Sequence, residues 1–165
     1  MQPIQTADFR TQTDLKDLDR VLAWFEQFQD VKVCQIPENV WLQCQLALVE
    51  GFTNAVRHAH RHVSSDTPID LQVSLFNDRL DISIWDYGPG FDMETWLAKT
   101  ANGVDKNSEG GRGVRLIAKI SDQMQYVKEP DGRNRLYMQK NFSCTNIDTT
   151  PEDLNNSLRS YRQML

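Results

Sequence analysis

The chain has 165 residues, of which 39% are hydrophobic and 25% are charged, values that are ordinary for one soluble globular domain with a real core. Its formal charge of −5 argues against non-specific nucleic-acid binding, which requires a concentrated basic surface, so no direct nucleic-acid contact is expected. The sequence shows neither an export signal nor an apolar run long enough to span a bilayer, which predicts a cytoplasmic protein without membrane contact.

The first part of the chain predicts a strand followed by a helix. Residues 3–9 form a weak strand pattern, and Thr11 or Thr13 is the expected N-cap of the helix. Apolar residues at helical spacing then form one stripe, namely Leu15, Leu18, Leu22 and Phe25. A structural role is predicted for this helix.

A second, longer helix is predicted from Pro37 to about His62. It is apolar on most of its circumference, yet it carries Glu50 and Asn54 at i and i+4, which places both side chains on one stripe. In a largely buried helix such groups need partners, and magnesium, phosphate oxygens and a reacting hydroxyl would supply them. The alternative is a solvated glutamate and a locally bonded asparagine on an exposed strip.

Cysteines and histidines do not predict a metal site. The cysteines Cys34, Cys44 and Cys144 are odd in number and lack CxxC spacing, so neither a disulfide framework nor a cysteine zinc site is suggested. His58 and His62 are an i, i+4 pair, but no further ligand lies at a suitable spacing. The histidines of this region are therefore expected to lie on the surface at the helix end.

A hairpin with strands at 69–76 and 80–86 is predicted next, because apolar and polar residues alternate in both segments. Asp86 continues the phase of the apolar residues of the second strand, so its carboxylate is expected to face the packed side, where it requires hydrogen-bond donors. The alternative is an aspartate that only starts a turn. The glycines that follow, Gly88 and Gly90, allow a flat ligand to approach the main chain closely.

The polar segment 99–109 has no periodicity and predicts a mobile loop. It leads into Gly110-Gly111-Arg112-Gly113 and an amphipathic helix, and glycines at the start of a helix allow backbone N–H groups to converge on an anion. A phosphate site is therefore predicted, with a flexible linker as the alternative. Strands at 123–128 and 134–141, a polar linker and a last helix starting near Thr150 complete the prediction.

Three segments in chain order resemble the N, G1 and G2 boxes of the Bergerat-fold ATPases, a superfamily that includes gyrase, sensor histidine kinases and MutL-type repair proteins. They are Glu50 to Asn54, Asp86 to Gly90, and Gly111 to Gly113, and the resemblance covers about residues 3–142. The segment from Glu50 to Ala59 is most similar to the N box of anti-sigma-factor serine/threonine kinases.

The resemblance implies an α+β fold, a two-layer sandwich whose mixed, mostly antiparallel sheet is covered on one face by helices. Residues 1–142 would be the ATP-binding kinase domain, and 143–165 a C-terminal linker and helix. Glu50 would be the catalytic base, Asn54 the Mg²⁺ ligand and Asp86 the acceptor for the adenine amino group, with 99–110 as a lid. The implied nucleotide-binding set is Asn54, Arg57, Asp86, Gly88, Gly90, Lys106, Gly110, Gly111, Arg112, Gly113 and Val114.

The function implied by the resemblance is that of a cytoplasmic, ATP- and Mg²⁺-dependent serine/threonine kinase and anti-sigma factor. Such a protein sequesters a sigma factor and phosphorylates a STAS-type anti-anti-sigma antagonist, commonly as a homodimer. The alternative is a regulatory module that binds ATP and switches a protein partner without phosphotransfer. Glu50 favours the kinase, because binding alone requires no base.

Overall fold

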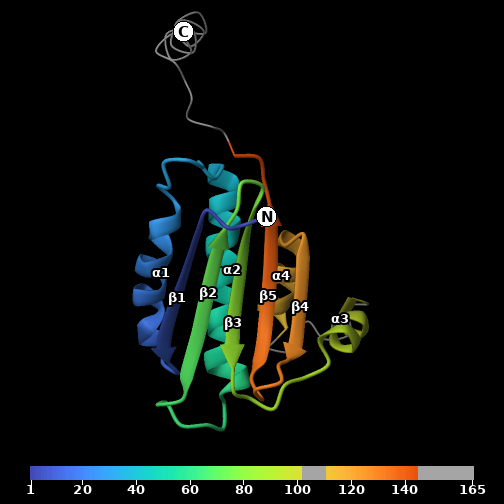
Figure 1. Ribbon diagram of the computed structural model, residues 1–165. Coiled ribbons are helices and arrows are strands. Elements are labelled where there is room, and N and C mark those ends of the chain that lie inside the picture. Colours follow the sequence, from blue (N-terminus) through green and yellow to red (C-terminus); the bar gives the residue numbers. More distant parts are fainter. Residues whose placement is uncertain (102–110, 145–165) are drawn as a thin grey trace, which may run out of the picture.

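The computed structural model describes residues 1–101 and 111–144, which form a two-layer α+β sandwich (Figure 1). Five strands form one sheet in the order β1-β2-β3-β5-β4, and they are β1 (Gln5–Gln12), β2 (Pro68–Leu75), β3 (Arg79–Asp86), β4 (Gln123–Lys128) and β5 (Asn134–Asn141). The helices are α1 (Leu18–Phe25), α2 (Glu38–Asn54), α3 (Met93–Ala101) and α4 (Arg112–Ile120), with the short turns η1 (Leu15–Asp17), η2 (Glu26–Phe28) and η3 (Ala55–Ala59). The predicted fold class is confirmed, with antiparallel pairing throughout the described sheet.

The helices α1, α2 and α4 lie on one face of the sheet, whereas α3 lies beyond the β4 edge (Figure 1). The other face carries polar side chains that remain in contact with water. Asp70 of β2 pairs there with Arg10 at 2.6 Å and with Arg133 at 2.9 Å. Ion pairs of this kind let the face stay uncovered without exposing an apolar surface.

The alternation predicted for the hairpin is confirmed by burial. Ile69, Leu71, Val73 and Leu75 of β2 and Leu80, Ile82 and Ile84 of β3 are each at most 2% exposed. They pack against buried residues of the helical layer, among them Leu48 and Phe52 of α2. Since apolar burial is the main favourable term in folding, this shared layer holds α2 against β3 and so fixes the relative positions of the functional segments.

The long helix begins after Pro37 as predicted, and it extends as α2 to Asn54 and then as one π-helical turn to Ala59. In this turn the backbone N–H of His60 donates to the carbonyl of Ala55 at 2.9 Å, five residues back. Turns of this type are rare and are frequently found at functional sites. Among the described residues, no helix is both long enough and apolar enough to cross a membrane.

The predicted helix cap near the N-terminus is wrong. Thr11 belongs to β1, which extends beyond the predicted strand, and its hydroxyl donates to the carboxylate of Asp17. The capping residue is Asp14, whose carboxylate accepts from the Lys16 backbone N–H at 2.9 Å at the start of η1. An aspartate in extended conformation can cap a helical turn as well as a threonine can, and Asp14 directly follows Thr13.

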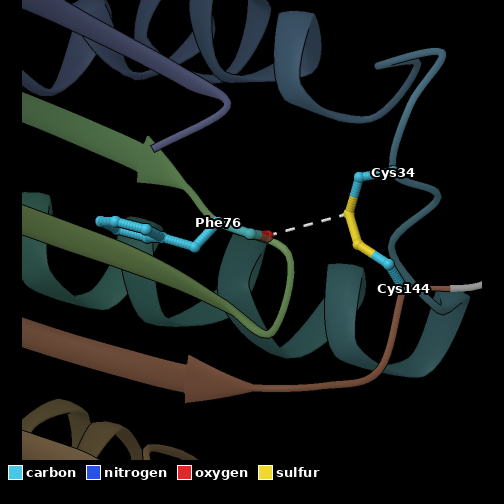
Figure 2. The surroundings of a disulfide bond; sticks show 3 residues. All are labelled: Cys34, Phe76 and Cys144. Carbon is cyan, nitrogen blue, oxygen red and sulfur yellow. Dashed lines mark hydrogen bonds between the residues drawn. A yellow bond between two sulfur atoms is a disulfide. The ribbon is translucent and has the colours of Figure 1, made fainter. Parts of the chain in front are cut away.

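A disulfide joins Cys34, in the loop before α2, to Cys144, just after β5 (Figure 2). The sequence did not suggest this bond, because the two cysteines are 110 positions apart and only the fold brings them together. Among the described residues Cys44 is the free cysteine, and burial raises the pKa of its thiol to about 12. Cys44 therefore remains a protonated, unreactive thiol at ordinary pH.

Reduction with dithiothreitol is expected to lower the free energy of unfolding by about 2–4 kcal/mol, because the bond restricts a long loop in the unfolded chain. Urea denaturation of oxidised and reduced protein would measure this difference. The effect should be absent in Cys144→Ser and should persist in Cys44→Ser, the matched control. The same effect of dithiothreitol in Cys144→Ser would contradict the assignment.

Candidate functional site

A cavity of about 240 Å³ lies where α2, the π turn and the sheet meet. The predicted site residues Asn54, Asp86, Gly90 and Val114 all line it. The remaining lining residues are Gly51, Ala55, His58, Ala59, Ile84, Pro89, Phe91, Met93, Tyr126 and Leu136. The walls are mostly apolar with a few convergent polar groups, which is typical of a small-molecule site.

Asp86 provides the buried polar group of this cavity. Its side chain is 4% exposed, as the strand alternation predicts. Its Oδ1 accepts from the backbone N–H of Gly88 at 2.8 Å and from Nδ2 of Asn134 at 2.9 Å, and its Oδ2 accepts from the hydroxyl of Tyr126 at 2.9 Å. Three donors from three segments therefore compensate the loss of hydration of this carboxylate.

The two glycines that follow Asp86 are required by close neighbours. A Cβ at position 88 would overlap the carbonyl oxygen of Ala59 in the π turn. Gly90 has a φ of +77°, and a Cβ there would lie 2.8 Å from Oδ1 of Asn134. The turn after β3 therefore packs against the end of the long helix on one side and against β5 on the other.

Glu50 lies against the first turn of α4. Gly111 is the buried N-cap of that helix, and a Cβ at Gly113 would overlap the Glu50 carboxylate oxygen. The glycine at 113 thus makes the space that the half-buried glutamate occupies. The structure thereby brings together the first and third of the predicted segments, which are separated by about a third of the chain.

Asn54 is the last residue of α2, is half-buried and faces the cavity one turn after Glu50. Its amide oxygen is a hard, neutral ligand of the kind that suits Mg²⁺. Among the described residues, no group of three or more His, Cys, Asp or Glu side chains could hold a metal ion without further ligands. This donor set fits Mg²⁺ that is held mainly by phosphate oxygens and water, because such ions need only one or two protein ligands.

Other predicted residues are less closely associated with the cavity. Arg57 and Arg112 are exposed, and neither lines it. Lys106 and Gly110 lie outside the described residues, as does most of the predicted lid, although 99–101 belong to α3. Among the predicted histidines His58 and His62 are exposed as expected.

His60 is buried, and the prediction of a surface histidine is wrong for this residue. The Thr13 hydroxyl donates to the carbonyl of Thr67 at 2.7 Å, so it must accept from Nδ1 of His60 at 2.6 Å. Nε2 of His60 then accepts from the backbone N–H of Tyr87 at 2.8 Å. Burial lowers the pKa of the ring below its ordinary value, and the negative charge of Asp86 offsets this in part. A neutral His60 therefore holds the turn next to Asp86.

Asn134 and Tyr126 were also not predicted from the sequence as site residues. Asn134 is 2% exposed and donates both to Asp86 and to the carbonyl of Gly88 at 2.8 Å, so it braces the turn from β5. Tyr126 reaches Asp86 from the edge strand β4. The sequence signal for this role was a polar residue, Asn134, at the first position of β5. Its partner Asp86 could not be inferred without the strand order.

Residues 11–140 match the family model of the histidine kinase-like ATPase domain. Because this match covers most of the chain, the chain belongs to that family. The site agrees with this assignment, since residues of the first two predicted boxes line one cavity and Val114, directly after the third box, lines it too.

Curated relatives include the serine-protein kinases RsbW of Staphylococcus aureus, 33% identical over 91 residues, and of Staphylococcus epidermidis, 34% identical over 90 residues. Each match covers 52% of this chain and 57% of the relative, so it spans little more than half the length of these proteins. The NMR structure of the histidine kinase domain of the E. coli osmosensor EnvZ is 14% identical, with a TM-score of 0.45 and coverage of 91% of this chain and 96% of that one. A TM-score this low does not support a family assignment, so the assignment rests on the match of residues 11–140 to the family model.

Protonation of His60 is expected to destabilise the folded protein. In the unfolded chain this ring titrates near 6.5, whereas in the folded state its pKa is lower. At a pH between the pKa of the folded state and that of the unfolded state, His60 carries a proton only in the unfolded chain. The free energy of unfolding should therefore fall as the pH decreases below 6.5, by at most about 1.4 kcal/mol per pH unit. Urea denaturation from pH 8 to 5.5 would measure this slope. His60→Gln should lose this component, and His62→Gln, an exposed control, should keep it.

Gly90→Ala is expected to be more harmful than Gly132→Ala. Both positions have positive φ, +77° and +90°, so both variants carry the same kind of backbone strain. Only at position 90 does the new methyl group meet a neighbour, since nothing lies within 4 Å of a Cβ at position 132. We expect Gly132→Ala to lower the free energy of unfolding by about 1–2 kcal/mol and Gly90→Ala to lower it more. Only Gly90→Ala should also lose ligand binding, because Gly90 lines the cavity. Equal effects would show that the contact with Asn134 is unimportant.

Proposed function

We propose that this protein is an ATP-dependent serine/threonine protein kinase that also acts as an anti-sigma factor. The single observation that carries the proposal is the close approach of the Glu50 carboxylate to Gly113, whose neighbour Val114 lines the same cavity as Asn54 and Asp86. The proposed proton acceptor Glu50, the proposed phosphate-binding start of α4 and the proposed adenine pocket around Asp86 then lie next to one another. The names of the RsbW relatives add support for a serine kinase.

In this proposal the base of ATP enters the cavity and its amino group meets Asp86. Gly90 leaves room for the ring, and Gly88 lets the turn pack closely against Ala59. The phosphates extend toward the first turn of α4, where the backbone N–H groups near Gly111, Gly113 and Val114 face negative charge. The further residues assigned to the nucleotide are Arg57, Lys106, Gly110 and Arg112.

The chemical step is assigned to the polar stripe of α2. Glu50 accepts the proton of a substrate Ser or Thr hydroxyl as its oxygen attacks the γ-phosphorus; the bond to the leaving ADP breaks as the new O–P bond forms. Asn54 would hold Mg²⁺ through its amide oxygen, and the ion would supply charge neutralisation at the phosphate oxygens. Residues 1–142 form the kinase domain in this proposal, and 143–165 an additional segment.

The proposed phosphoacceptor is a STAS-type anti-anti-sigma protein, and the proposed sequestered partner is a sigma factor. Phosphorylation would release the antagonist and leave the kinase free to hold the sigma factor, in the cytoplasm and as a homodimer. The support for these partners is the likeness of the sequence around Glu50 to anti-sigma-factor kinases, together with the RsbW relatives.

Incubation with γ-labelled ATP, Mg²⁺ and a lysate of the source cell is expected to label a small protein with an acid-stable phosphate. Glu50→Gln should abolish the label, because the amide cannot accept the proton, while ATP binding is retained. Glu94→Gln, which changes an exposed glutamate of α3, is the matched control and should label normally. An acid-labile label would indicate a histidine-kinase-like reaction instead, and ATP binding without transfer would favour a regulatory binding module.

A further inference from the structure

Two of the residues that line the cavity, Asp86 and Tyr126, carry oxygens that can accept hydrogen bonds. Oδ1 of Asp86 already accepts from Gly88 and Asn134, whereas Oδ2 accepts only from Tyr126. A carboxylate oxygen has two lone pairs, so Oδ2 can take one further donor. The Tyr126 oxygen, which gives its own hydrogen to Asp86, likewise retains accepting capacity. Asp86 and Tyr126 both line the cavity, and these two oxygens, 2.9 Å apart, retain accepting capacity.

The position of Tyr126 is well defined by its neighbours. In the sheet register it lies opposite Leu136, a residue that is 7% exposed and lines the cavity, so both side chains are on the helical side of the sheet. Its ring packs against Phe91 with 4.9 Å between centroids. The phenol stays protonated because burial, followed by the charge of Asp86, raises its pKa. The hydroxyl is thus a fixed donor to Asp86, and its oxygen can still accept from a ligand in the cavity that Tyr126 lines.

We propose that Tyr126 is a specificity-determining residue, whose hydroxyl oxygen and Oδ2 of Asp86 together accept the two hydrogens of an exocyclic amino group on a purine base. The inference rests on the proposed nucleotide function and adds a second recognition group to Asp86. A carbonyl oxygen in the same position would face two acceptors, which repel it and leave it without a partner in a buried site. The pocket thereby selects adenine over hypoxanthine, which has a carbonyl in place of the amino group.

A purely structural role for Tyr126 would give a different pattern. The tyrosine links β4 to β3 through Asp86 and to the turn through Phe91, so its loss could disturb the cavity as a whole. Such a disturbance would weaken all purine nucleotides alike. A specificity role changes the ratio of affinities between an amino and a carbonyl purine, and this ratio separates the two roles.

Calorimetric titration of the full chain with ATP and with ITP, each with Mg²⁺, tests the proposal. The wild type should bind ATP at least about tenfold more tightly than ITP, the factor expected from a paired against an unpaired polar group. Tyr126→Phe, which keeps the ring and its contact with Phe91, should weaken ATP about tenfold and leave ITP within about twofold. Tyr137→Phe is the matched control: its hydroxyl contacts Gln139 on the open face, and neither nucleotide should be affected.

An unchanged or increased ratio of ATP to ITP affinity in Tyr126→Phe would overturn the assignment, as would equal binding of ATP and ITP by the wild type. The second outcome requires no variant, so it can overturn the assignment even if Tyr126→Phe does not fold. Failure of the wild type to bind either nucleotide would instead reject the proposed function, and the Tyr126 assignment with it. Nucleotide binding with a changed ratio but no phosphotransfer would support Tyr126 while rejecting the kinase.

Discussion

The buried carboxylate of Asp86 is the constraint on which the arrangement of this site depends. An ionised carboxylate loses much free energy when it leaves water, and it stays in a folded protein only where donors replace the hydration shell. Here the donors come from the following turn, from Asn134 on β5 and from Tyr126 on β4. One side chain therefore ties three strands and a turn together at the end of the sheet that carries the cavity.

The same turn is held from its other side by the long helix. His60 accepts the backbone N–H of Tyr87, and the carbonyl of Ala59 leaves no room for a side chain at Gly88. The helix that carries Glu50 and Asn54 thus also positions Asp86, through its last turn. Groups from the two layers of the fold are fixed relative to each other by these contacts, which is what recognition of a ligand between layers requires.

The sequence predicted those features that depend on local periodicity. The alternation of Leu80, Ile82 and Ile84 places Asp86 on the packed face, and burial confirms it. What it could not predict depends on the order of strands or on departures from regular geometry. Asn134 and Tyr126 meet Asp86 only because β5 lies between β3 and β4. His60 was expected on the surface as one of the histidines at the helix end. A regular α-helix would continue its buried stripe from Ala55 to position 59, whereas the π turn moves burial on to position 60.

The disulfide has a consequence for the integrity of the chain. Cys34 and Cys144 enclose everything between them in one covalent ring, which includes α2, four of the five strands and all the described residues assigned to the nucleotide. A single cut of the backbone anywhere inside this ring gives two pieces that remain one covalent molecule. Such a nicked protein would keep its mass apart from one added water, and its two pieces would separate only once the bond is reduced and the fold is lost.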